Sequence, residues 1–285
     1  MKINQLPPQD NQYTQVLTNI AKTPKCLYFI GKLPETRLPT VAIVGTRKPT
    51  AYGTEVTQRL ASELASRGVV IVSGLALGVD ALAHKAALDA GGLTLAVLGN
   101  GLPRIYPSTH AQLAKHIVES GGAIMTEYEE GMPALSHQFL ERNRIVSGLA
   151  DAIIITEAAS RSGTLNTAAH ALEQGKEVFV VPGNITSPMS MGCNFLLKQG
   201  AHVLTCVEDV LEIIAPDLLQ PQGSLALGTT PLETEVIRLL QAGIRDGDEI
   251  QKTIGSSATD LSVALTMLEL HGTIRALGAN QWTLR

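Results

Sequence analysis

The chain has 285 residues, of which 45% are hydrophobic and 4% aromatic, and its formal net charge is −4 at pH 7. This composition excludes fibrous and disordered chains, and the length suffices for one large domain and a smaller one. The acidic balance excludes attraction of nucleic acid by the molecule as a whole, so such binding requires a local basic patch.

The sequence also limits the compartment. No apolar run approaches the roughly 18 residues needed to cross a bilayer, and the N-terminus is polar, without the apolar core of a signal peptide. The three cysteines, Cys26, Cys193 and Cys206, are far apart. This pattern is typical of reduced thiols and offers no metal-binding spacing. We therefore expect a cytoplasmic protein without membrane association.

Residues 1–37 are predicted to form an arm on the main domain, with a short amphipathic piece at 13–20 and a candidate edge strand at 27–30. Residues 38–214 then alternate short apolar runs with segments of helical periodicity. The apolar runs are 41–45, 69–73, 94–98, 123–126, 152–156, 178–181 and 202–204. Continuous apolar strands separated by helices predict an α/β fold, a Rossmann-like doubly wound domain whose parallel sheet is covered on both faces.

Residues 215–230 are rich in proline, glycine and glutamine, which predicts a linker to a second domain at 231–285. Within that domain, helical segments at 231–240, 247–254 and 259–270 precede a predicted β-hairpin. Three helices followed by a hairpin is the element order of a winged helix.

This winged-helix-like domain has an unusual charge balance. From residue 229 to the end, seven acidic residues outnumber five basic ones, and the third helix, 259–270, contains no lysine or arginine. Phosphate contacts need such residues. We therefore expect the domain to pack against protein and not to recognise duplex DNA.

Three strand-to-helix turns carry glycine and charge: 45–49, 73–80 and 157–164. In a doubly wound sheet, ligands bind beyond the carboxyl ends of the strands. Glycine lets the backbone approach an anion closely, and helix N-termini offer free N–H groups to phosphate oxygens. Positive charge at this edge comes from Arg47, Lys48 and Arg161. Together these features predict a pocket for a phosphate-bearing chain.

A helix over 139–149 would place Arg142 in the middle of an apolar arc that includes Ile145 and Leu149. Its guanidinium is therefore predicted to point inward or into a cleft. There it needs an anion, since an unpaired buried charge is strongly destabilising. Arg144 is expected to complete the basic pocket, and Phe139 is a candidate for stacking on a base, worth about 1–3 kcal/mol per base.

The same residues also have structural interpretations. Arg142 pairs in that case with Glu127 or Glu157, Phe139 belongs to the core, and the glycines serve only tight turns. Asp80 is expected to cap the helix that follows its glycine turn.

Motifs of other protein classes are absent from the sequence. There is no Gly-x-Gly-x-x-Gly after the first strand, no P-loop, no Gly-x-Ser-x-Gly and no His-Glu-x-x-His. His84 and His170, on predicted helices, are expected at the surface or behind a site and not as metal ligands.

Five ordered motifs resemble the DprA/Smf family of DNA-processing proteins. They are Gly45-Thr46-Arg47, Ser73-Gly74 through Gly78 and Asp80, the run from Arg142 to Leu149, Ser162-Gly163-Thr164, and Val181-Pro182-Gly183. The resemblance is strong over about residues 13–214 and moderate in the tail. It implies a domain that binds single-stranded DNA without sequence preference, protects incoming strands and loads RecA recombinase onto them during natural transformation.

The resemblance also implies a homodimer, a single-strand-binding protein as a further partner, and no enzymatic activity, cofactor or metal. By this analogy Arg47, Phe139, Arg142, Arg144 and Arg161 are assigned to DNA; the family often has lysine where Arg161 stands, so the charge is kept. The adjoining motif residues complete the predicted DNA-binding set, which adds Gly45, Thr46, Lys48, Ser73, Gly74, Asn143, Ser162, Gly163 and Thr164.

Two other functions stay open from the sequence. Ser162-Gly163-Thr164 after Glu157 weakly resembles the nucleotide-cleaving phosphoribohydrolases, in which a carboxylate assists N-glycosidic cleavage, although the doubled glycine of that group is missing. A pure assembly scaffold is the third hypothesis; it would bind neither DNA nor nucleotide.

Overall fold

All seven apolar runs form strands, within one residue of the predicted bounds. They are β3 Thr40–Val44, β4 Val70–Ser73, β5 Thr94–Val97, β6 Ala123–Thr126, β7 Ala152–Ile155, β8 Glu177–Val180 and β9 His202–Val203. Every residue within the strands β3, β4, β5, β6 and β7 is buried, as expected for strands covered on both faces of the sheet.

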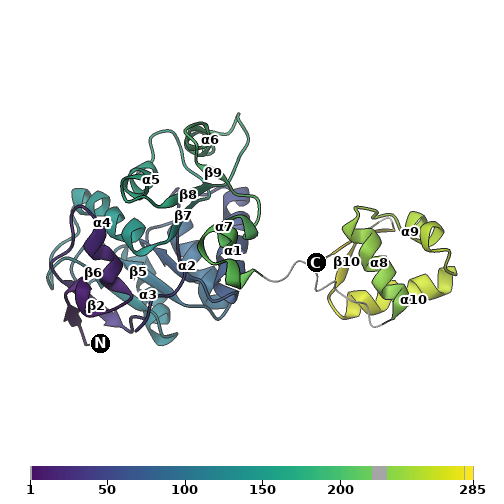
Figure 1. Cartoon of the computed structure of the whole chain (residues 1–285), viewed down its shortest axis with the longest axis horizontal. Helices are drawn as coiled ribbons and strands as arrows, with labels where there is room; N and C mark the ends of the chain where they lie inside the picture. Colours follow the sequence, from purple (N-terminus) through teal and green to yellow (C-terminus); the bar gives the residue numbers. More distant parts are fainter. Residues whose placement is uncertain (1, 220–229, 279, 285) are drawn as a thin grey trace. The chain divides into compact units, whose positions relative to one another are not determined.

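In this computed structural model, the strands belong to one sheet of order β1-β2-β6-β5-β4-β3-β7-β8-β9 (Figure 1). All neighbours from β6 to β9 are parallel. At the other edge, β2 Leu27–Gly31 and β1 Asn4–Leu6 are antiparallel, so the sheet is mostly parallel. The predicted edge position of 27–30 was wrong, because the polar three-residue β1, invisible in the hydrophobic pattern, covers that strand.

Helices cover both faces of the sheet. They are α1 Ala51–Ser66, α2 Val79–Asp89, α3 Ala111–Glu119, α4 Ser136–Leu149, α5 Thr164–Glu173, α6 Met191–Lys198 and α7 Glu208–Ile214. Helices α4 and α5 share a core with residues such as Leu95 and Val97 of β5, whereas α3 packs with Ala96 of the same strand. Since alternate strand residues point to opposite faces, α4 and α3 lie on opposite sides of the sheet.

Short 3-10 turns connect these elements: η1 Pro8–Asp10, η2 Thr14–Asn19, η3 Ser108–His110 and η4 Pro216–Leu218. The predicted amphipathic piece at 13–20 is η2. It packs on α4 at Gly148, where an added Cβ would come within 2.8 Å of the Leu17 side chain.

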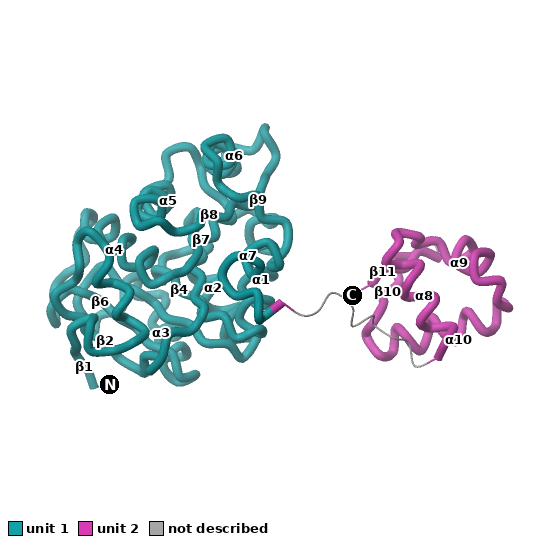
Figure 2. Tube along the Cα trace, viewed as in Figure 1, with its two compact units in different colours: residues 1–218 teal, residues 219–285 magenta. Residues whose placement is uncertain are grey.

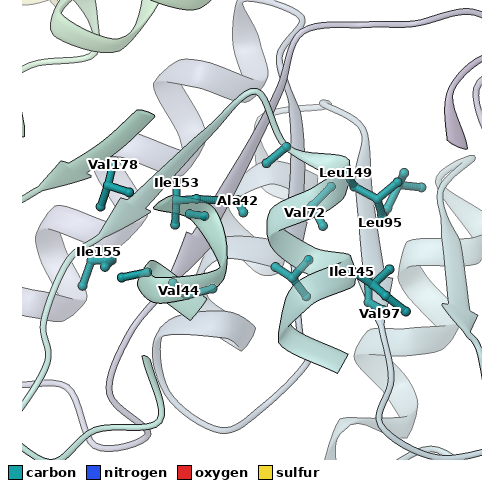
Figure 3. Packing of buried hydrophobic residues seen from close by; sticks show 14 of the residues in the cluster. Ala42, Val44, Val72, Leu95, Val97, Ile145, Leu149, Ile153, Ile155 and Val178 are labelled. Atoms are coloured by element: carbon teal, nitrogen blue, oxygen red, sulfur yellow. The ribbon is translucent and has the colours of Figure 1, made fainter. Parts of the chain in front are cut away.

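Helix α4 is anchored on the sheet by its apolar arc. Figure 3 shows Ile145 and Leu149 against the side chains of β4 and β5, including Val97 and Leu95. Both α4 side chains are fully buried, and each contributes roughly 1.5–3 kcal/mol of burial free energy. This packing fixes the rotation of the helix about its axis and therefore the direction of its arginines.

The structure describes residues 2–219, 230–278 and 280–284, and the chain divides into two units, 1–218 and 219–285 (Figure 2). The predicted arm 1–37 lies in the first unit. Of the predicted linker 215–230, residues 220–229 lie outside the described residues. Within the described ranges, no helix combines the length and hydrophobicity that crossing a membrane requires.

The second unit has the predicted winged-helix order. Its elements are α8 Pro231–Gln241, α9 Gly247–Ile254, α10 Ala258–Leu270, β10 Ile274–Gly278 and β11 Gln281–Leu284, with the two strands antiparallel. Each helix begins at a side-chain cap, from Thr230, Asp246 and Ser257 in turn. Its core is formed by residues such as Val236, Ile250 and Leu265.

Candidate functional site

The direction of strand addition reverses at β3: the strands that follow lie on one side as far as β6, and β7 then pairs with the other side of β3. Ligands bind at such a switch point in doubly wound sheets. A pocket of about 470 Å³ opens there, which we call the switch-point pocket. Ten of the fourteen predicted DNA-binding residues line it: Gly45, Thr46, Arg47, Phe139, Arg142, Asn143, Arg161, Ser162, Gly163 and Thr164.

The other four predicted residues lie elsewhere. Lys48 is exposed, and its backbone N–H donates to Thr46 Oγ1 at 3.2 Å. Ser73 is buried, and its hydroxyl donates to the Ile43 carbonyl at 2.7 Å. Gly74 lines a smaller adjoining cavity, and Arg144 lies on the other side of α4.

Arg142 points inward as predicted, with only 5% of its surface exposed. Its guanidinium donates to the carbonyl oxygens of Gly74, at 2.7 Å, and Val97. Burial lowers the pKa of Arg142, and the nearby Asp80 carboxylate opposes that shift. An added Cβ on Gly74 would lie 2.3 Å from Arg142 Nη2, so the close approach requires glycine. Arg142 is thus held mainly by main-chain carbonyls.

The predicted alternative partners of Arg142 were wrong. Glu127 binds Arg144, and Glu157 accepts hydrogen bonds from the backbone N–H and hydroxyl of Thr50 at 2.9 and 2.6 Å. Glu157 is 2% exposed and does not line the switch-point pocket. Both carboxylates follow strands at the carboxyl edge of the sheet, as expected, but each faces a different neighbour.

Asp80 does not cap its helix as predicted. Helix α2 begins after Gly78 without a side-chain cap, and the buried Asp80 carboxylate accepts the backbone N–H groups of Gly74 and Ala76 at 3.1 and 3.3 Å. Burial raises the pKa of Asp80, whereas Arg142 and the two amides oppose the rise. The amides of this glycine turn are therefore already bound to an anion of the protein itself.

Exposed positive charge at the pocket comes from the two other turns. Arg47 and Arg161 are exposed at the pocket, and α5 begins there, where Ser162 Oγ accepts the Thr164 N–H at 3.2 Å. Among the described residues that line the pocket, Asp80 is the sole carboxylate, against three arginines. The pocket is therefore locally basic although the chain is acidic overall.

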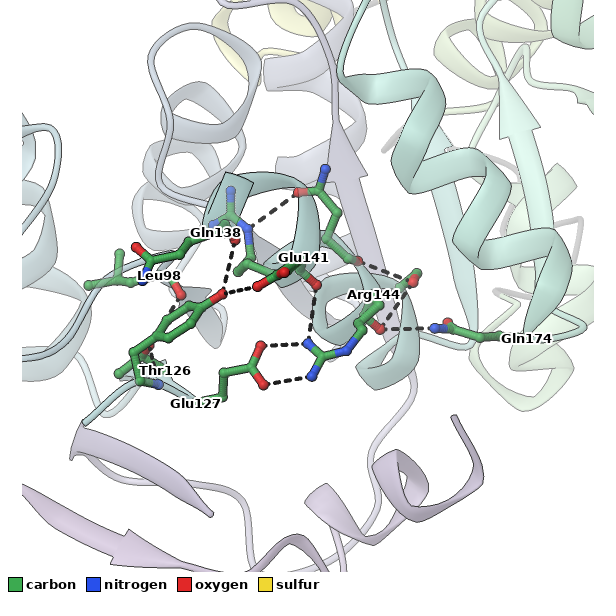
Figure 4. A network of polar contacts seen from close by, with 11 residues as sticks. Leu98, Thr126, Glu127, Gln138, Glu141, Arg144 and Gln174 are labelled. Atoms are coloured by element: carbon green, nitrogen blue, oxygen red, sulfur yellow. Dashed lines mark hydrogen bonds and ion pairs between the residues drawn. The ribbon is translucent and has the colours of Figure 1, made fainter. Parts of the chain in front are cut away.

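The Arg144 side chain lies outside the pocket and pairs with Glu127 (Figure 4). Its guanidinium makes two hydrogen bonds to Glu127, at 2.5 and 2.6 Å, and the two side chains are 12% and 16% exposed. Gln174 of α5 donates to the Arg144 carbonyl at 3.0 Å. Two helical residues span 200°, so Arg142 and Arg144 face opposite directions. The prediction that Arg144 completes the pocket was wrong.

The sequence analysis missed one aromatic residue at the site. Tyr106, in the loop after β5, packs on Phe139 with ring centroids 5.2 Å apart. Tyr106 is half exposed and Phe139 is partly buried. Its position in the sequence could have identified Tyr106, because the loop after β5 also begins at the carboxyl edge of the sheet, where ligands bind.

The two helix histidines differ in environment. His84 is fully buried, which excludes the surface alternative and leaves the position behind a site; its Nδ1 lies 2.6 Å from Thr94 Oγ1, and burial lowers its pKa to about 3. His170 is partly exposed beside Glu173. Among the described residues no cluster of potential metal ligands is present.

The fold defines a Rossmann-like protein with a winged-helix module. A family model for DNA recombination-mediator protein A matches residues 4–215, and a model of the DprA winged helix domain matches residues 220–280. Protein Smf of Escherichia coli (strain K12) is 45% identical over 207 residues, 73% of this chain. DNA processing protein DprA of Bacillus subtilis (strain 168) is 40% identical over 74% of this chain and 71% of its own length. The chain belongs to the DprA/Smf family of DNA-processing proteins.

Solved structures agree with this assignment. DprA from Streptococcus pneumoniae is 37% identical with a TM-score of 0.69, and the match covers 75% of each chain. DNA processing protein A from Helicobacter pylori, described for its single-stranded DNA binding mode, is 33% identical with a TM-score of 0.66 over 76% of this chain and 97% of that one. The chain spans 55% of the length of the Escherichia coli relative and 66% of a Mycobacterium tuberculosis relative.

Proposed function

We propose that this protein binds single-stranded DNA without sequence preference in the switch-point pocket. The observation that carries the proposal is the convergence of Arg47, Arg142 and Arg161 with the start of α5 in one pocket of about 470 Å³. Arginines and helix N-termini bind phosphate, which every nucleotide carries, so such contacts hold a strand without selecting its sequence. The Helicobacter pylori relative with a described single-stranded DNA binding mode supports the same ligand.

The strand's phosphates are assigned to the exposed arginines Arg47 and Arg161 and to the backbone of 162–164. Arg142 lies deeper and contributes its charge from the floor of the pocket. About 3–4 neutralised phosphates per subunit would give a slope of log affinity against log salt of about −2 to −3 for a single strand. Lys48, exposed beside the pocket, is a further candidate for a phosphate outside it.

We further propose that the bound strand is incoming DNA, which the protein protects and onto which it loads RecA during natural transformation. It would act as a homodimer in the cytoplasm, with a single-strand-binding protein as a further partner. Family membership supports these roles, and the three free cysteines are typical of a reducing compartment. The winged-helix domain is proposed to contact protein, since α10 carries no basic side chain.

The nucleotide-cleaving alternative has lost its geometric basis. It requires a carboxylate beside the turn at 162–164, but Glu157 is bound to Thr50 and does not line that pocket. The carboxylate that does line it, Asp80, is bound to backbone amides. No observation favours a second function strongly enough to propose it.

The test is fluorescence-anisotropy binding of a labelled poly-dT oligonucleotide across a salt series. Arg47→Ala with Arg161→Ala changes two exposed side chains, and we expect the slope to become shallower by about 1.4, for two lost phosphate contacts. Arg59→Ala with Arg238→Ala is the control, because it removes the same charge from exposed positions outside the pocket.

Three outcomes would contradict the proposal: a wild-type slope near zero, equal slopes in the wild type and the pocket variant, or displacement of the oligonucleotide by equimolar duplex DNA. For the RecA role, we expect wild type, and not the pocket variant, to speed RecA filament formation on strands coated with single-strand-binding protein. Base release from a nucleoside monophosphate would instead support the enzyme hypothesis.

A further inference from the structure

A small cavity of about 60 Å³ adjoins the switch-point pocket and shares Arg47, Ala76, Phe139 and Arg142 with it. Its remaining lining comes from the glycine turn and from the loop after β5, and includes Leu77 and Tyr106. We call this cavity the aromatic slot. It has apolar and aromatic sides, and it borders two of the three pocket arginines.

The two rings of the aromatic slot are held in place by the surrounding loop. Tyr106 and Phe139 pack with ring planes 39° apart. An added Cβ on Gly99 would lie 2.9 Å from the Phe139 ring, so glycine in the loop just after β5 makes room for that ring. The Asn100 side chain donates to the Arg104 carbonyl at 2.7 Å, and His110 Nδ1 lies 2.9 Å from the Leu75 carbonyl oxygen. These contacts tie the loop to itself and to the glycine turn.

Part of the aromatic slot nevertheless remains open to solvent. Tyr106 is 50% exposed and Leu77 is 48% exposed, although both are large side chains beside a polar pocket. The contact of Tyr106 with Phe139 accounts for the buried part of the ring. It gives no structural reason for the half that is exposed. A positioned ring with one open side is the geometry on which a planar ligand stacks.

We infer that Tyr106 is a base-binding residue, and that one nucleobase of the bound strand stacks on its open side while the adjoining phosphate lies among the arginines. The cavity, at about 60 Å³, is too small for a whole base, so the base would insert only its edge. Every base has a flat π-face, so stacking adds affinity without adding sequence preference. This inference rests on the proposed function and deepens it.

The test compares two oligonucleotides of equal length, poly-dT and an abasic strand with the same phosphates. For Tyr106→Ala we expect roughly a 5- to 150-fold loss of affinity for poly-dT, no loss for the abasic strand, and an unchanged salt slope. Tyr106→Phe keeps the ring and should retain wild-type affinity. Tyr52→Ala, which removes an equally exposed ring on α1, is the control and should change neither affinity.

The outcomes separate the two proposals. If Tyr106→Ala weakens both strands equally, or neither, the ring does not bind a base and the inference is overturned, while salt-dependent binding by wild type still supports the proposed function. If wild type binds poly-dT and the abasic strand equally tightly, base stacking is absent and the inference again fails. If wild type binds neither strand, the proposed function fails and the inference fails with it.

Discussion

Substitution of Arg144 distinguishes an arginine that stabilises the fold from one that binds DNA. In Arg144→Met, the Glu127 carboxylate loses both of its hydrogen bonds from the guanidinium while it stays largely buried. Removing one partner of a buried ion pair typically destabilises a protein by about 3–5 kcal/mol. The two side chains keep 12% and 16% exposure, so water compensates part of the loss, and we expect the low end of that range. Even so, this is a large fraction of the roughly 5–15 kcal/mol that stabilises a typical domain.

The assay is urea unfolding followed by far-UV circular dichroism, with DNA affinity measured separately in the absence of denaturant. The single tryptophan, Trp282, lies in the second unit, so its fluorescence reports that unit's unfolding and should not change. The double variant Arg144→Met with Glu127→Leu leaves no unpaired charge. We expect it to recover most of the lost stability, which a double-mutant cycle measures as coupling.

The DNA measurement decides between the two roles. Folded Arg144→Met should bind poly-dT with wild-type affinity and an unchanged salt slope, because its guanidinium does not line the switch-point pocket. A shallower slope in the stable double variant would refute this reasoning and return Arg144 to the DNA-binding set. Unchanged unfolding in the single variant would refute the assigned structural role.

Two further predictions concern residues near Arg142. Gly74→Ala should displace Arg142 and lower both the free energy of unfolding and the DNA affinity. The control is Gly163→Ala, whose added Cβ meets only Leu140 at 3.9 Å and should leave stability unchanged in the same urea assay. Equal effects of the two substitutions would contradict the close approach of Arg142 to Gly74. The pKa of His84 is about 3 in the fold against 6.5 when unperturbed, so only the unfolded chain takes up this proton between those values. His84 therefore lowers stability by about 1.4 kcal/mol per unit as the pH falls below about 6.5, and has no effect above it. His84→Gln should remove that part of the slope in unfolding experiments at pH 5 to 7, and an unchanged slope would show that His84 is protonated in the native state.

The sequence predicted the sheet well, because fully buried parallel strands appear as continuous apolar runs. The same logic predicted the inward direction of Arg142, since its position on the apolar arc of α4 follows from helical periodicity alone. The polar strand β1 could not be predicted in this way, because three residues pairing through their backbones leave no hydrophobic pattern.

The hydrogen-bond and ion-pair partners of the charged side chains were harder to predict from the sequence than the directions in which those side chains point. Arg144 and Glu127 are 17 residues apart, and only the folded sheet brings the end of β6 beside α4. The 200° between Arg142 and Arg144, in contrast, follows from helical periodicity and is sufficient to place the two arginines on different faces of the helix. Asp80 accepts amide hydrogens from residues that precede it, a contact that depends on the shape of the glycine turn and not on its composition.

The hydrogen bonds of Asp80 also stabilise the pocket when no ligand is bound. The Asp80 carboxyl group, within the protein itself, accepts the Gly74 and Ala76 amides and lies close enough to Arg142 to oppose the burial-driven fall of its pKa. The floor of the pocket therefore has its hydrogen bonds made within the protein, without a bound ligand. Under the proposed function, the exposed Arg47 and Arg161 and the backbone of 162–164 would exchange phosphate for water. If the proposed function is correct, release and recapture of a strand would leave this floor unchanged, as the proposed transfer of the strand to RecA requires.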